Sequence, residues 1–199
     1  EETGFDCSFR DKKYQFDKLV LPNTLTSIGE NAFDSCGNLA EVEIPSSVEL
    51  INAGSFNYCT TLSKINIPEG VETIGAGAFA NCSALSEINL PSSLTKIGEF
   101  SFSGCGFVSF TLPKQFTVVP ASMLNLCAKL TTVIFEGDIT TIEEQAFAGC
   151  DALTSFTIPD TVITIGDQAF DNCNNLETVT LPSNASFTEV SNHLFNGCD

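Results

Sequence analysis

A segment of about 23 residues recurs along almost the whole chain, and this repetition limits the chain to a stacked architecture. Eight copies each start at an apolar residue, and six of the seven spacings between these starts are 23 residues; the other is 22. A constant period in this range is typical of repeat proteins, in which each unit packs only on its neighbours. The copies start at Phe16, Leu39, Leu62, Leu85, Phe107, Leu130, Leu153 and Leu176.

Each copy begins with a predicted strand, as in Leu39 to Ile44. Apolar residues occupy its first, fourth and sixth positions and a polar residue separates the last two, which is the alternation of a strand with one buried face. A proline follows in seven copies, with Glu136 as the one departure. Because proline has no N–H, it ends the strand.

The rest of each copy predicts a turn and then one short helical turn, as in Ile28 to Cys36. Acidic residues such as Glu30 and Glu99 stand at its start, where a helix N-terminus favours negative charge. An Ala-Phe pair recurs in the helical turn, and its phenylalanines are expected to form one continuous internal column. The column comprises Phe33, Phe56, Phe79, Phe102, Phe147, Phe170 and Phe195, with Leu124 as a substitute in the fifth copy.

The pattern L-x-x-I-x-I-P-x-x-V-x-x-I-G-x-x-A-F-x-x-C resembles the BspA-like class of leucine-rich repeats, found in bacterial surface antigens and in some parasitic protists. The resemblance covers Phe16 to Cys198. It implies an α/β repeat solenoid, a right-handed superhelix with a parallel β-sheet on the concave side and short helical turns on the convex side. The fifth copy departs most, with Val119-Pro120 for Ile-Gly and Met123-Leu124 for Ala-Phe, and it predicts a local bend in the stack.

The predicted organisation is an N-terminal cap or partial repeat in residues 1–15, followed by eight repeats in residues 16–199. No linker separates the repeats, so we expect no second domain within them. The last repeat stops directly after Cys198 without a polar cap over its edge. We therefore expect the repeats to be a segment of a longer protein.

The chain is strongly acidic, with a formal net charge of −17. From residue 19 onward, 20 acidic residues stand against four basic ones. This field repels phosphate backbones and anionic lipids, so we expect no nucleic-acid partner. No apolar run approaches the roughly 18 residues of a membrane span, so we expect no direct membrane insertion.

Nine cysteines suggest a metal site or disulfides, but their spacing favours neither. No two are closer than 22 residues, and stacking would point the thiols in parallel rather than converging on a metal or closing a disulfide. We predict a column of buried thiols that act as small apolar residues, and no cofactor. The column comprises Cys36, Cys59, Cys82, Cys105, Cys127, Cys150, Cys173 and Cys198.

No pattern in the chain predicts a catalytic site. The single histidine, His193, has no serine or cysteine partner beside it in the repeat register. Glu143 and Glu144 are adjacent on a turn and do not face each other, and a uniform stack offers no cleft for a carboxylate pair. We therefore expect a protein that is not an enzyme.

The third and fifth residues of each predicted strand point away from the core and form an outer face. Its first half is charged and its second half is rich in Ser and Thr. Two explanations remain open: threonine simply suits a strand, or this face contacts a partner. The candidate binding residues are Glu41, Glu43, Lys64, Asn66, Glu87, Asn89, Ser109, Thr111, Thr132, Ser155, Thr157, Thr178 and Thr180.

The resemblance implies a surface-exposed or secreted protein, since some proteins of this class are adhesins that bind host extracellular-matrix proteins such as fibronectin and fibrinogen. Our hypothesis is a non-enzymatic adhesion protein that recognises a protein or glycan through the concave face. Two alternatives remain. The segment is a structural spacer or self-assembling solenoid, or it is the targeting module of a larger enzyme.

Overall fold

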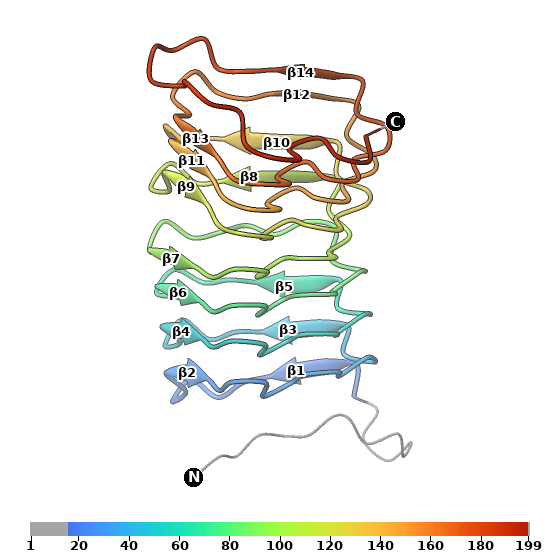
Figure 1. Ribbon diagram of the computed structural model, residues 1–199. Helices are drawn as coiled ribbons and strands as arrows, with labels where there is room; N and C mark the ends of the chain where they lie inside the picture. Colours follow the sequence, from blue (N-terminus) through green and yellow to red (C-terminus); the bar gives the residue numbers. More distant parts are fainter. Residues whose placement is uncertain (1–15, 199) are drawn as a thin grey trace.

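The computed structural model describes residues 16–198, in which successive repeats form the coils of a β-solenoid (Figure 1). The coils lie one on another from the N-terminal end of the stack to the C-terminal end. The predicted parallel-strand solenoid is therefore confirmed, whereas the predicted cap at residues 1–15 lies outside the described residues.

Most coils contribute two short strands, and these form two rows along the stack. The first row, which contains the predicted strands, is β1 (Lys18–Val20), β3 (Glu41–Glu43), β5 (Lys64–Asn66), β8 (Ser109–Leu112), β10 (Thr132–Phe135), β12 (Ser155–Thr157) and β14 (Thr178–Thr180). The second row, which lies in the turn after the proline position, is β2 (Ser27–Ile28), β4 (Leu50–Ile51), β6 (Thr73–Ile74), β7 (Lys96–Ile97), β9 (Val118–Val119), β11 (Thr141–Ile142) and β13 (Thr164–Ile165).

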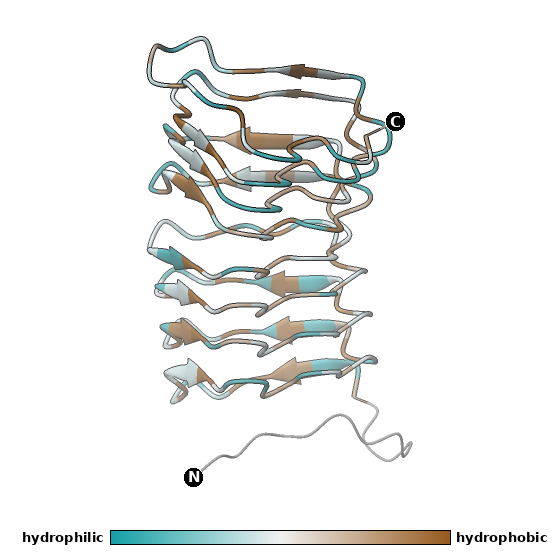
Figure 2. Cartoon of the chain, viewed as in Figure 1, coloured by the Kyte–Doolittle hydropathy of each residue, from teal (hydrophilic) through white to brown (hydrophobic). Residues whose placement is uncertain are grey.

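Paired strands are parallel, and the paired residues are one repeat apart. Val42 of β3 lies opposite Leu19 of β1 and Ile65 of β5. Equivalent residues therefore stack into columns, and apolar positions recur beside hydrophilic ones in the strands of successive coils (Figure 2). The repeat register thus decides both the core and the surface.

The predicted short helical turn is wrong, because the described residues contain no helix. In the turn at residues 29–36, the N–H groups of Ala32 and Cys36 bond to carbonyls three residues earlier. The N–H groups of Asn31 and Phe33 instead bond to carbonyls of the next coil, at 2.9 and 2.8 Å. An α-helix needs each N–H for the carbonyl four residues earlier, so a turn that uses alternate N–H groups for stacking cannot be helical.

The backbone of these turns also contains two left-handed residues per coil, such as Asn31 with φ 52° and Ser35 with φ 59°. Glycine adopts this conformation most easily and usually ends a helix when it does so. Two such residues four apart leave no room for a helical turn between them. Glycine takes one of the two positions in several coils, as at Gly54, Gly77, Gly104, Gly149 and Gly197.

Stacked phenylalanine rings form the predicted column inside the solenoid. Phe33, Phe56, Phe79 and Phe102 follow one another with ring centroids 5.3, 5.4 and 5.8 Å apart. The column is interrupted in the fifth coil, where Leu124 stands. The ring of Phe102 there packs against Phe107 and Phe110 instead, and the column resumes from Phe147 through Phe170 to Phe195.

The first row is not one continuous sheet, because β1, β3 and β5, then β8 and β10, then β12 and β14 pair separately. Residues 87–89 form no strand, contrary to the prediction. The interruptions before β8 and β12 precede the two coils with a phenylalanine, Phe110 or Phe156, at the central inward position. A phenyl ring needs more room there than the Leu, Val or Ile of the other coils, and both rings pack into the phenylalanine column.

One buried hydroxyl in the core has no hydrogen-bond partner. Ser101 is fully buried, and among the described residues its Oγ atom is the only buried side-chain N or O atom without a partner. We expect Ser101→Ala to raise the free energy of unfolding by about 1 kcal/mol, because an unsatisfied polar group is removed. The equivalent Ser55 donates to the carbonyls of Asn52 and Gly29 at 2.6 and 3.1 Å. Ser55→Ala should therefore lower stability by about 1 kcal/mol.

Chemical denaturation of both serine variants beside the unchanged protein measures these two effects. An equal loss of stability in Ser101→Ala and Ser55→Ala would mean that the Ser101 hydroxyl has a hydrogen-bond partner in solution, and would contradict the absence of such a partner in the structure.

Candidate binding face

The structure places the predicted binding residues on one outer face of the first row. All thirteen are exposed except Glu41 and Thr111, which are half-buried. The residues between them point inward, and Val42, Phe110 and Phe156 are at most 7% exposed. Glu87 and Asn89 also lie on the surface, although they belong to the coil that has no strand in this row.

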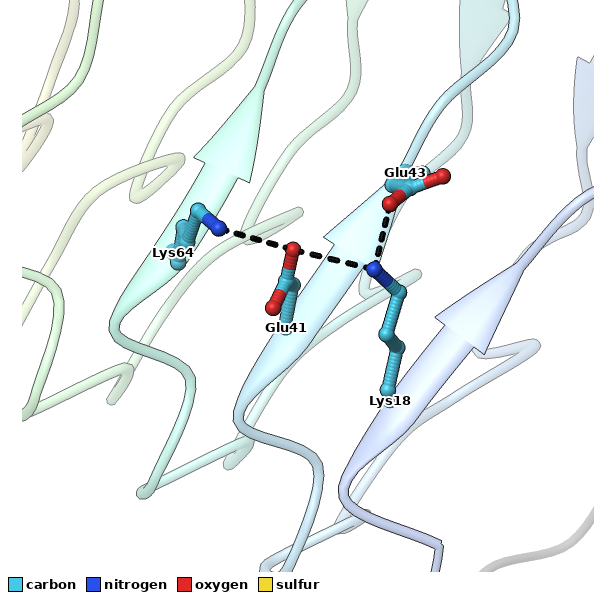
Figure 3. A network of polar contacts seen from close by, with 4 residues as sticks. All are labelled: Lys18, Glu41, Glu43 and Lys64. Carbon is cyan, nitrogen blue, oxygen red and sulfur yellow. Dashed lines mark hydrogen bonds and ion pairs between the residues drawn. The ribbon is translucent and has the colours of Figure 1, made fainter.

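Four charged side chains on β1, β3 and β5 form a connected network at the N-terminal end of this face (Figure 3). The Glu41 carboxylate accepts hydrogen bonds from Lys64 Nζ at 2.9 Å and from Lys18 Nζ at 3.2 Å. Lys18 also pairs with Glu43. The hydrogen bonds from Lys64 and Lys18 lower the pKa of Glu41, and those to Glu43 and Glu41 raise the pKa of Lys18. These charges thus neutralise one another within the sheet.

The C-terminal half of the face, on β8, β10, β12 and β14, is lined by hydroxyl groups. No other described residue forms a hydrogen bond with the hydroxyls of six of them, so these groups remain available to a ligand. The six are Ser109, Thr111, Ser155, Thr157, Thr178 and Thr180. The seventh hydroxyl, on Thr132, makes one long contact of 3.5 Å to Thr131. We call these seven residues, together with Ile134, the hydroxyl half.

Ile134 is the large apolar residue in the hydroxyl half. It lies opposite Thr111 in the β8–β10 pair, and 47% of its surface is exposed. Ile134 is the fifth residue of its predicted strand and so was expected on the outer face, but it was not among the candidate binding residues. Its place at an outward strand position is the signal that identifies it, and only Val20 on β1 offers a comparable apolar residue at that position.

The cysteine column lies inside the solenoid, where its thiols donate hydrogen bonds. Cys59 Sγ lies 3.2 Å from the Phe33 carbonyl oxygen, and the later cysteines repeat this contact with the preceding coil. Burial raises the pKa of Cys59, Cys127 and Cys173 to about 12. These thiols stay protonated and are poor nucleophiles. Cys36 departs from the predicted thiol column because it is disulfide-bonded.

Residues 16–198 contain no group of three or more His, Cys, Asp or Glu side chains placed to hold a metal ion. His193 is exposed, with a left-handed backbone at φ 54°. The same part of the chain has no helix that could cross a membrane.

A family model described as "BspA type Leucine rich repeat region" matches residues 6–130 and 72–199. No curated protein matches the chain.

Several solved structures of bacterial proteins are similar to the solenoid. A leucine-rich repeat protein from Bacteroides ovatus is 33% identical, with a TM-score of 0.77 over 83% of this chain and 45% of its own. A leucine-rich repeat protein from T. pallidum is 29% identical, with a TM-score of 0.74 over 82% of this chain and 79% of its own. A leucine rich cell surface protein from Faecalibacterium prausnitzii is 25% identical, with a TM-score of 0.60 over 96% and 66%. The chain thus spans less than half of the B. ovatus protein.

Proposed function

Because the chain belongs to the BspA-type leucine-rich-repeat proteins, we propose that it is a non-enzymatic protein that binds a protein partner at a cell surface or outside the cell. Stacked repeats present long regular surfaces, and such surfaces commonly bind other proteins. The similar F. prausnitzii protein is described as a cell surface protein, which supports the location.

We place the binding site on the hydroxyl half of the outer face. The observation that carries this assignment is the set of six exposed or half-buried hydroxyls without hydrogen-bond partners among the described residues, which are in register within the β8–β10 and β12–β14 pairs and share this face with the exposed Ile134. Binding sites commonly combine an apolar anchor with surrounding polar groups that hydrogen-bond to the partner. The charged half is less suited to this role, because Lys18, Glu41 and Lys64 already pair with one another.

A binding role without catalysis agrees with the state of the thiols, the strongest candidate nucleophiles in the chain. Those of Cys59, Cys127 and Cys173 are buried and have pKa values of about 12, so neither access nor ionisation favours reaction with a substrate.

The test is binding of the purified chain, at physiological salt, to a panel of extracellular-matrix proteins and glycans. We expect saturable binding to a protein of this panel. The triple variant Thr111→Lys, Thr157→Lys, Thr180→Lys should weaken it by about tenfold or more, because long charged side chains replace hydroxyls on the hydroxyl half.

The control carries the same added charge away from the outer face, in the exposed positions Asn38→Lys, Thr60→Lys and Ala128→Lys. Equal loss in both variants would assign the effect to net charge rather than to the site. Binding retained by the first variant would move the site elsewhere. Binding to glycans alone, or self-association alone, would favour a glycan receptor or a spacer over the proposed protein-binding role.

A further inference from the structure

The second row of strands is interrupted once, between β7 and β9, although the chain continues from one coil to the next. At the following junction, the N–H groups of Thr140 and Thr141 both bond to the Thr117 carbonyl, at 2.7 and 3.2 Å. The equivalent bonds from Thr117 and Val118 to Thr95 do not form. The Thr117 and Val118 N–H groups at β9 and the Thr95 carbonyl beside β7 therefore have no backbone partner in the neighbouring coil.

Pro120 explains why the ladder opens at this junction. In the second, third, fourth, sixth and seventh coils the residue at this position donates its N–H to the preceding coil, as Gly98 does to Ile74 at 2.9 Å and Glu143 does to Val119 at 3.0 Å. Proline has no N–H, so the Ile97 carbonyl loses the donor that would close the ladder. The fifth copy was expected to distort the stack, and the interruption falls at its Val119-Pro120 pair.

One side-chain hydrogen bond is kept across this junction. At other junctions the equivalent residue bonds to a carbonyl of the preceding coil, as Ser93 does to Val71 at 2.8 Å and Asn184 does to Val162 at 2.8 Å. Here the position is taken by Gln115, whose Nε2 atom donates to the Leu94 and Pro91 carbonyls at 3.1 and 3.3 Å. The side-chain bond therefore forms although the backbone bonds of Thr117 and Val118 do not.

Neither row of strands is paired across this junction, because residues 87–89 of the first row form no strand either. On the turn side, Phe100 and Phe102 still donate to the carbonyls of Ala121 and Met123, both at 3.1 Å. An open groove of about 890 Å³ runs along the second row from Leu50 to Glu143, and its lining at this junction includes Thr95, Ile97, Gln115, Thr117, Val118 and Pro120. Figure 1 shows the corresponding wide spacing between β7 and β9.

We propose that this groove accepts an extended peptide segment of a partner protein, which adds a strand between β7 and β9. Exposed strand edges bind extended peptides through main-chain hydrogen bonds, and this groove offers two such edges, one on each side. The Thr95 and Ile97 carbonyls would accept from the peptide, and the Thr117 and Val118 N–H groups would donate to it. This site is separate from the hydroxyl half and does not depend on it.

The occupant follows from the chemistry of the groove. Its unsatisfied groups are backbone donors and acceptors in strand geometry, which an extended main chain matches best. A second folded copy is a poorer fit, because the strands of residues 16–198 are already built into the stack.

Hydrogen exchange of the full chain tests whether the groove exists in solution. The amides of Thr117 and Val118 are expected to exchange roughly 100-fold faster than those of Thr140 and Thr141, whose hydrogen bonds are formed. Equal protection of the two pairs would mean that the ladder is closed, and would overturn the proposal.

Peptide selection tests the occupant. Displayed random peptides of about 12 residues are selected on the full chain, and one selected peptide is synthesised together with a form N-methylated at alternate backbone amides. Binding should weaken about tenfold or more on N-methylation, since the peptide loses main-chain donors. Pro120→Gly, which restores the missing N–H, should weaken it similarly, whereas the matched Pro159→Gly and the triple lysine variant should bind normally.

Three results would overturn the proposal. One is a peptide affinity that neither N-methylation nor Pro120→Gly changes. Another is a selection that yields no peptide with a higher affinity for the unchanged chain than for Pro120→Gly. The third is a concentration-dependent dimer that Pro120→Gly abolishes, which would assign the groove to a second copy of the chain.

Discussion

Raising the pH from about 9 to about 10 is expected to lower the free energy of unfolding by about 6 kcal/mol. The cause is the column of six buried free thiols, each of which contributes about 1 kcal/mol over this interval, because an unfolded thiol is half ionised at pH 9 and almost fully ionised at pH 10. Burial raises the pKa of every one of them. The six are Cys59, Cys82, Cys105, Cys127, Cys150 and Cys173.

The sign follows from the protons bound in each state. An unfolded thiol loses its proton near its ordinary pKa of about 9, whereas the folded thiols of Cys59, Cys127 and Cys173 keep theirs up to about pH 12. Between these values the unfolded state binds fewer protons, so stability falls as pH rises. Below about pH 8 both states are protonated, and the thiols add no pH dependence.

Urea unfolding of the protein with its Cys36 disulfide intact, at a series of pH values, measures this effect. Lysines and tyrosines also titrate in alkali, so the decisive comparison is with Cys127→Ala, which removes one thiol. Between pH 9 and pH 10 the stability of this variant should fall by about 1 kcal/mol less than that of the unchanged protein. If the free energy of unfolding fell with pH at the same rate in both proteins above pH 9, the Cys127 thiol would ionise equally in the folded and unfolded states, which would contradict this prediction.

Phe79→Ala is expected to lower the free energy of unfolding by about 3 to 5 kcal/mol. Phe79 is fully buried, and its ring is stacked between Phe56 and Phe102 at centroid distances of 5.4 and 5.8 Å. Truncation leaves a cavity and removes both stacking contacts, and the rigid coils above and below cannot close the space.

Phe79→Leu is the matched control, because Leu124 occupies the same position in the fifth coil. We expect it to lower stability by only about 1 to 2 kcal/mol. Chemical denaturation of both variants measures the difference. Equal losses for Ala and Leu, or a loss below about 1 kcal/mol for Ala, would contradict a tightly packed column.

The sequence predicted correctly those features that depend only on residues within one repeat. The alternation in Leu39 to Ile44 and the following Pro45 predicted a strand, and β3 lies there. The recurrence of phenylalanine predicted the internal column. The turn was mispredicted because a helical turn and successive tight turns both bring Phe33 and Cys36 together. The choice between them depends on carbonyls of the next coil, to which Phe33 donates, and no single repeat contains that information.

The candidate sites were likewise predicted only in those parts that depend on single repeats. Strand alternation correctly identified outward residues such as Thr157 and Thr180, but the candidate binding residues did not include Ile134, which the same alternation points outward. Pro120 was recognised as a departure from the repeat. That the ladder opens there depends on the hydrogen bonds that Thr117, Val118 and the Ile97 carbonyl fail to make with the neighbouring coil, which only the stacked coils reveal.

Recognition of a protein partner through the hydroxyl half is tested most directly by comparing Ile134→Asp with Val20→Asp. Both residues are exposed and hold the same strand position, one in the hydroxyl half and one in the charged half. The Kd for the protein bound in the matrix panel should rise about tenfold or more with Ile134→Asp and stay unchanged with Val20→Asp. An unchanged Kd for Ile134→Asp, or a rise confined to Val20→Asp, would contradict this assignment.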